Sequence, residues 1–258
     1  MPSTGDDSRQ LDAERPANCQ LQIWHSATGV DHRGPFEIRC EKLLNSGELA
    51  NADRFRRVTT RNQHIVGRAM ARRLLGDERV APHSIEFSAG QYGKPHVLHP
   101  KEANQPFNIA HTDGLVLFGI ADQEAELVGV DVECTDRRTS TELAERYFSK
   151  PEIEFLRTQP MERQKYFFLR IWTLKEAFIK AIGTGLHTPL ADFAFERIDS
   201  SSPSINFLPP YLNEDRNWNF IVFEPRNGFI ASAAVAAKRK NSKVGVHWRA
   251  FESLLEEP

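Results

Sequence analysis

The stretch Gly129-Val130-Asp131-Val132-Glu133 lies in an otherwise apolar run and decides how this part of the chain folds. Successive side chains of a β-strand point to opposite faces, so a strand here would place Asp131 and Glu133 on one face. A solvated face at the end of a sheet is the simpler interpretation. The valines beside Asp131, however, indicate a buried neighbourhood, where carboxylates are costly unless they are paired or metal-bound. The pattern therefore favours a functional carboxylate pair.

A second block, Trp172-Thr173-Leu174-Lys175-Glu176-Ala177-Phe178-Ile179-Lys180, has the apolar periodicity of a helix. Glu176 and Lys180 are four residues apart and share one side of such a helix, which is also the pattern of an ordinary exposed ion pair. Trp172 would share their face, which is unusual for a solvated side. Lys175 lies on another side and is expected to face solvent or to make a minor contribution. Three carboxylates and one ammonium from two elements predict a Mg²⁺ site that handles a phosphate ester.

Composition narrows the class of protein. The 258 residues carry a formal net charge of −2, which argues against a dedicated nucleic-acid binder. No run approaches the ~18 apolar residues of a membrane span. The first 17 residues lack the apolar core of a secretion signal. Three isolated cysteines suggest reduced thiols. We therefore expect a cytoplasmic protein that has no nucleic-acid or membrane partner.

The periodicity of the chain predicts an α+β fold in two parts. Residues 1–18 have too few apolar groups to order themselves and read as a disordered lead-in. In the first part we expect a helix over 47–75 and strands over 21–24, 84–88 and 115–121. In the second part we expect a strand over 127–132, helices over 140–157 and 161–182, and a hairpin of strands 219–223 and 229–236. The similar rhythm suggests two related halves.

Other residues have structural interpretations beside functional ones. A lone histidine such as His111 is usually structural, and it gains interest only as a phosphate ligand. Lys94-Pro95 is also the pattern of a rigid turn. His96 and His99 lie between prolines and are expected in a loop. The sequence has no glycine-rich phosphate loop of the Walker or dinucleotide type and no GxSxG motif.

Taken together, four blocks occur in an order that resembles the 4′-phosphopantetheinyl transferases of the Sfp type (the Gsp/Sfp/HetI-like family): Tyr92-Gly93-Lys94-Pro95, Phe107-Asn108-Ile109-Ala110-His111-Thr112, Gly129 to Glu133 and Trp172 to Lys180. The similarity continues through Arg146-Tyr147-Phe148-Ser149 and Gly183-Thr184-Gly185-Leu186. It covers roughly residues 20 to 240. This joint pattern is far more specific than any one block.

The resemblance implies a monomer of two similar α/β halves with antiparallel sheets, related by a pseudo-two-fold axis. Residues 19–125 would form the half beside the adenine and 3′-phosphate of coenzyme A. Residues 126–258 would carry the metal site and the docking surface for a carrier protein. Coenzyme A would lie in the cleft between the halves.

The resemblance also implies a reaction. Phosphopantetheine would pass from coenzyme A to a serine of an apo acyl or peptidyl carrier protein of fatty-acid, polyketide or peptide synthesis, releasing 3′,5′-ADP. Asp131, Glu133 and Glu176 would hold Mg²⁺, with Mn²⁺ as a substitute. Lys180 would contact the phosphates, and Glu176 would take the serine proton, directly or through a metal-bound water. The residues implied to bind coenzyme A are Arg61, His64, Lys94, Pro95, His111, Asp131 and Lys180.

Some positions depart from the family pattern. Ala110 stands where a serine is frequent, and Glu48 and Asn51 stand where several members have basic residues. A carrier protein is usually acidic near its modified serine, so we expect it to dock on Arg137, Arg138, Tyr147 and Phe148. An alternative from another class is a catalytically silent coenzyme A-binding protein. Retention of all three carboxylates and Lys180 argues against that alternative and against a purely structural module.

Overall fold

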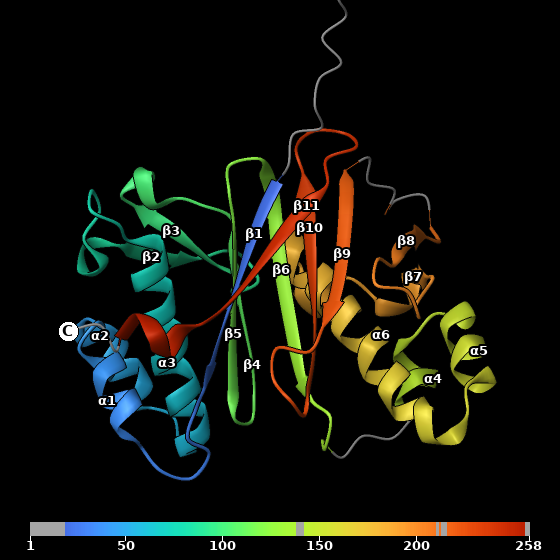
Figure 1. Ribbon diagram of the computed structural model, residues 1–258, viewed down its shortest axis with the longest axis horizontal. Helices are drawn as coiled ribbons and strands as arrows, with labels where there is room; N and C mark the ends of the chain where they lie inside the picture. The colour runs from blue at the N-terminus through green and yellow to red at the C-terminus, as the bar shows by residue number, and fades with distance from the viewer. Residues whose placement is uncertain (1–18, 138–141, 210–211, 213–215, 256–258) are drawn as a thin grey trace, which may run out of the picture.

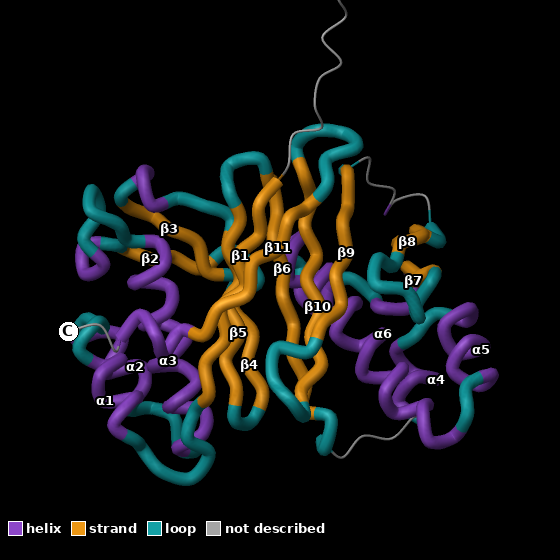
Figure 2. Tube along the Cα trace, in the orientation of Figure 1, coloured by secondary structure: helices purple, strands orange, loops and turns teal. Residues whose placement is uncertain are grey.

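The structure is a computed structural model that describes residues 19–137, 142–209, 212 and 216–255. The expected lead-in at residues 1–18 lies outside the described residues. Two sheets face each other at the centre, and helices cover the outer side of each, so the molecule has four layers (Figures 1 and 2). Helix and strand are both abundant and nearly all strand pairs are antiparallel, which confirms the predicted α+β class with antiparallel sheets.

The first sheet has the order β11-β1-β5-β4 and is built from both ends of the chain. Strand β11 runs parallel to β1, and Figure 1 shows the two crossing the molecule side by side. No periodicity predicted β11. The division of the chain into halves at residue 125 stays a prediction. Strand β11, near the end of the chain, belongs to the sheet of the first half. The bounds are β1 (Cys19–Ala27), β4 (Phe107–Thr112), β5 (Leu115–Ala121) and β11 (Val244–Ala250).

The second sheet has the order β6-β10-β9, and two hairpins complete the strands. Between the two sheets lies a core of alternate side chains, such as Ile23 of β1, Leu117 of β5 and Val130 of β6, all fully buried. The bounds are β6 (Ala125–Cys134), β9 (Asn217–Phe223), β10 (Phe229–Ala237), and the hairpin pairs β2 (Glu86–Ala89) with β3 (Pro95–His99) and β7 (Phe193–Glu196) with β8 (Ser204–Phe207).

Helices α1 (Pro35–Glu41), α2 (Ser46–Ala52) and α3 (Val58–Leu75) cover the first sheet. The single helix predicted over 47–75 is wrong, because it is interrupted between α2 and α3. In the connecting segment the only apolar side chain, Phe55, is 41% exposed, so nothing anchors a helical turn there. Beyond it, α3 buries Ile65, Ala69 and Met70 and ends before Gly76.

Helices α4 (Leu143–Tyr147), α5 (Lys150–Thr158) and α6 (Met161–Ile182) cover the second sheet. The helix predicted over 140–157 is also divided, and residues 140 and 141 lie outside the described residues. Ser149 and Glu152 form a capping box that begins a new helix, with a proline in its first turn. Helix α6 ends at Gly183, whose φ of +74° suits glycine. No helix among the described residues is long and apolar enough to cross a membrane.

The prediction that Lys175 faces solvent is wrong, because its side chain is fully buried. Its ammonium lies 2.8 Å from Glu152 and donates to the carbonyls of Leu190 and Phe193 at 2.6 Å. Glu152 in turn accepts from Ser149 and from the backbone of Phe195. This buried network fixes α5 and β7 against α6.

Replacing Lys175 with Met should lower the free energy of unfolding by about 3 kcal/mol, because Glu152 keeps a buried charge without its cation. Urea denaturation of K175M measures the loss, and K150M, which removes an exposed lysine of α5, is the matched control. A loss in K175M below about 1 kcal/mol, the range of exposed ion pairs, would contradict the described network.

Candidate active site

Helix α6 lies directly on strand β6 because Gly129 has no side chain. A Cβ atom at Gly129 would be 2.0 Å from the carbonyl oxygen of Ala177 and 2.4 Å from the backbone nitrogen of Ala181. This close approach joins the two blocks singled out in the sequence. Lys180 of α6 therefore reaches Asp131 of β6, and its Nζ lies 2.5 Å from Oδ1.

Asp131 and Glu133 are buried on the same face of β6, as the alternation predicted, with 6% and 8% of their surfaces exposed. Burial raises the pKa of Asp131, and Lys180 opposes that rise. Burial, followed by the charge of Asp131, raises the pKa of Glu133 to about 7. Thr112 lies 3.4 Å from Glu133, and Arg137 forms an ion pair with it. The two carboxylates are thus held by cations of this chain.

Glu176 is the third carboxylate of the group. Burial and then the charge of Asp131 raise its pKa to about 7. Asp131 therefore lies within electrostatic range of both glutamates. Even so, within the described residues no three His, Cys, Asp or Glu side chains stand close enough together to form a metal site. The structure instead shows these carboxylates with Lys180 and Arg137 among them.

The donor set is nonetheless suited to a divalent cation. Oδ2 of Asp131 is buried and has no hydrogen-bond partner. A buried, unpartnered carboxylate oxygen is costly, and a bound cation would satisfy it. Carboxylate oxygens are also the ligands that Mg²⁺ takes in proteins. Asp131, Glu133 and Glu176 thus have the chemistry of Mg²⁺ ligands, and Asp131 offers a free oxygen, although the three side chains would have to approach one another to share an ion.

Two adjoining cavities open beside this group. The larger, about 700 Å³, is lined by His64, Arg68, Pro95 and His111 among others. The smaller, about 200 Å³, is lined by Lys94, Lys180 and Gly183 among others. Gly93, Pro95 and Ile109 line both cavities. Together they run from helix α3 to Lys180.

Two residues that line the larger cavity each have a buried polar atom without a hydrogen-bond partner, Nε2 of His64 and Nη1 of Arg68. Burial, followed by the charge of Arg68, lowers the pKa of His64. The Arg68 guanidinium lies over the ring of Phe87 at 4.9 Å and 3.7 Å from Glu48. No sequence motif assigned a function to Arg68. Its position four residues after His64 on one helix was the available signal.

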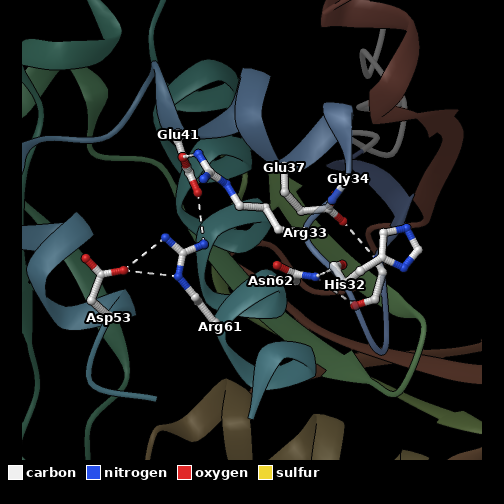
Figure 3. Close-up of polar contacts among 9 residues, drawn as sticks. His32, Arg33, Gly34, Glu37, Glu41, Asp53, Arg61 and Asn62 are labelled. Atoms are coloured by element: carbon white, nitrogen blue, oxygen red, sulfur yellow. Dashed lines mark hydrogen bonds and ion pairs between the residues drawn. The ribbon is translucent and has the colours of Figure 1, made fainter. Parts of the chain in front are cut away.

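The charged groups of Lys94 and Arg61 both bind other groups of this chain. The Lys94 ammonium donates to the carbonyls of Val128 at 2.9 Å and Ala181 at 2.8 Å, and burial lowers its pKa to about 8. Arg61 lies between Glu41 and Asp53, each 2.9 Å away (Figure 3). Arg61 lines neither cavity, so the structure does not group it with His64, Pro95 and His111.

The predicted docking residues differ in accessibility. Phe148 is 3% exposed and stacks on Phe168 with ring centroids 5.1 Å apart, so its assignment to a docking surface is wrong. An apolar residue in this aromatic core cannot meet a partner. Tyr147 is half-buried against Trp172. The Arg137 side chain is 47% exposed. Arg138 lies outside the described residues.

Comparison with known proteins shows the family of the chain. The model of the 4′-phosphopantetheinyl transferase superfamily matches residues 127–236, which include β6 and α6. The chain is 32% identical to the 4′-phosphopantetheinyl transferase HetI of Nostoc sp., over 75% of this chain and 78% of that protein. It is 30% identical to the 4′-phosphopantetheinyl transferase ffp of Bacillus subtilis, over 84% of this chain and 92% of that protein.

Among solved structures, holo-(acyl-carrier-protein) synthase of Thermotoga maritima matches at 25% identity with a TM-score of 0.37, covering 45% of this chain and 66% of that one. The family model and the relatives define an enzyme of the transferase class. The chain belongs to the 4′-phosphopantetheinyl transferase superfamily, which confirms the resemblance drawn from its sequence.

Proposed function

We propose that this protein transfers the 4′-phosphopantetheine group of coenzyme A to a serine of an apo acyl or peptidyl carrier protein and releases 3′,5′-ADP. The observation that carries the proposal is the meeting of Asp131, Glu133, Glu176 and Lys180 where α6 packs on β6, beside the two cavities. An ammonium among carboxylates is suited to a diphosphate, whose charge grows as the leaving ADP separates.

Coenzyme A would extend through the two adjoining cavities. Its nucleotide would occupy the larger cavity, where the Arg68 guanidinium would donate to the 3′-phosphate and His64 would donate once protonated. Pro95 and His111 line the same cavity. The diphosphate would reach Lys180 through the smaller cavity. In this arrangement Lys94 supports the cavity wall by holding the β2–β3 hairpin to β6 and α6.

Asp131, Glu133 and Glu176 would hold Mg²⁺, with Mn²⁺ as a substitute. The ion, when bound, would neutralise charge on the diphosphate. The Lys180 ammonium would stabilise the leaving phosphate. Glu176 would accept the serine proton, directly or through a metal-bound water. The new bond joins the serine Oγ to the β-phosphorus, and the bond from that phosphorus to the oxygen of ADP breaks.

An acidic carrier protein would dock near the end of β6. The residues we propose there are Arg137, Arg138 and Tyr147, since Phe148 is buried. We further propose that the protein acts as a monomer in the cytoplasm, without nucleic-acid or membrane partners. The physiological pathway would be fatty-acid, polyketide or peptide synthesis.

Replacing Arg68 with Met should raise the KM for coenzyme A about 10-fold, because a charged donor to the 3′-phosphate is lost. The KM for dephospho-coenzyme A, which lacks that phosphate, should stay unchanged. Steady-state kinetics with both substrates separate the two effects. Arg73→Met, on the same helix but outside the cavity lining, is the control. An equal rise for both substrates would contradict this role of Arg68.

The proposed function is tested by following 3′,5′-ADP release chromatographically while calorimetry measures coenzyme A binding. Release that requires an apo carrier protein supports a transferase. Tight coenzyme A binding without release across acyl and peptidyl carriers would favour the alternative, a catalytically silent coenzyme A-binding protein.

A further inference from the structure

Two cations of this chain occupy the carboxylates that the proposed function assigns to a metal. Lys180 lies 2.5 Å from Asp131, and Arg137 forms an ion pair with Glu133. The proposed reaction uses Lys180 at the phosphates. It assigns no role to the contact between Arg137 and Glu133, although that contact engages a carboxylate oxygen that a metal would need.

The geometry around Arg137 combines a fixed backbone with a half-exposed side chain. The turn after β6 is closed by the backbone hydrogen bond from Arg137 to Cys134, 3.1 Å long. Thr135 fastens the turn to β10 by donating its backbone nitrogen and its hydroxyl to the Gly228 carbonyl, at 2.8 and 3.0 Å. The Arg137 side chain is 47% exposed, whereas that of Glu133 is 10% exposed. The guanidinium can therefore leave Glu133 without moving the strand.

We propose that Arg137 is a positioning residue. Its guanidinium occupies the Glu133 carboxylate while no metal is bound there, and it leaves Glu133 when an acidic carrier protein docks. This inference rests on the proposed function. A guanidinium and a divalent cation compete for the same carboxylate oxygens and repel each other. An acidic partner offers Arg137 a second carboxylate, so its docking frees Glu133. Because such coupling is reciprocal, carrier docking and metal binding strengthen each other.

The competition is tested by calorimetric titration of Mg²⁺ into the full-length protein at pH 8 without substrate. Arg137→Gln should bind Mg²⁺ about fivefold more tightly than the wild type, the scale of a half-exposed ion pair. Arg137→Lys, which keeps the charge, should stay within about twofold of the wild type. Arg146→Gln removes a nearby exposed cation that has no contact with Glu133 and is the control. Equal or weaker binding by Arg137→Gln overturns the proposal.

The coupling is tested by repeating the titration with an apo acyl carrier protein whose acceptor serine is replaced by alanine. The carrier should raise the Mg²⁺ affinity of the wild type about fivefold and leave that of Arg137→Gln unchanged. No rise in the wild type, or an equal rise in both proteins, overturns the coupling. Parallel reactions with the unmodified carrier report transfer separately. Normal transfer with unchanged Mg²⁺ isotherms refutes only this inference, whereas no transfer to any carrier refutes the proposed function.

Discussion

Replacing Asp131 with Asn is expected to lower kcat/KM for phosphopantetheine transfer by about 100- to 1,000-fold, the scale of losing a group that stabilises transition-state charge. Asp131 pairs with Lys180 and lies within electrostatic range of Glu133 and Glu176. Its replacement therefore removes the central charge of the group. Glu176→Gln should cause a loss of similar size, because it removes the proposed proton acceptor.

Neither substitution should unfold the protein. Asparagine has nearly the size of aspartate, so it fills the same space on β6, and Lys180, whose side chain is partly exposed, keeps access to solvent when it loses its partner. Rates are measured by the mass gain of a carrier protein, with thermal unfolding of each variant alongside. Glu126→Gln, at an exposed position on the same strand, is the control. Near-normal rates in Asp131→Asn and Glu176→Gln would refute the assigned roles.

The second large effect is expected at Gly129. An alanine Cβ would overlap backbone atoms of Ala177 and Ala181 at 2.0 and 2.4 Å. Helix backbone cannot yield as a flexible side chain does, so the C-terminal part of α6 would be forced away from β6. We expect Gly129→Ala to lower the free energy of unfolding by at least about 3 kcal/mol, the upper range for overpacked cores. Glu176 and Lys180 would be displaced with the helix, so activity should be lost as well.

Urea denaturation of Gly129→Ala measures the loss of stability. The control is Gly47→Ala in α2, where the nearest atom to an added Cβ is 3.4 Å away. Alanine is also the better helix former there, so the control should match or exceed the wild type. A stable and active Gly129→Ala variant would show that α6 does not pack on β6 as described.

The sequence predicted the elements that carry the site better than it predicted their surroundings. Alternation placed Asp131 and Glu133 on one face, and the long apolar period placed Glu176 and Lys180 on one helix. Both patterns are local, so one stretch of sequence suffices to read them. The packing of α6 on β6 is a long-range contact. Its only sequence signal is a glycine within a strand, which also suits a bulge.

Other features depended on contacts that no local pattern reports. Lys175 was expected to face solvent because it lies on another side of the helix from Glu176 and Lys180, yet Glu152 of helix α5 provides a buried partner. Strand β11 depends on its pairing with β1, which comes from the other end of the chain. Arg137 stands four residues after Glu133, but the turn that brings the two side chains together forms only where Thr135 meets Gly228. Periodicity shows which residues share one face of a helix or strand. It does not show which other part of the chain packs on that face.

The most direct test of the account is the intact mass of an apo acyl carrier protein after incubation with this protein, coenzyme A and Mg²⁺. A parallel reaction contains EDTA, and a third receives excess Mg²⁺ after EDTA. The account predicts a gain of one phosphopantetheine group that EDTA blocks and added Mg²⁺ restores. A full gain in EDTA would contradict the role given to Asp131, Glu133 and Glu176. No gain on any acyl or peptidyl carrier would contradict the proposed transfer itself.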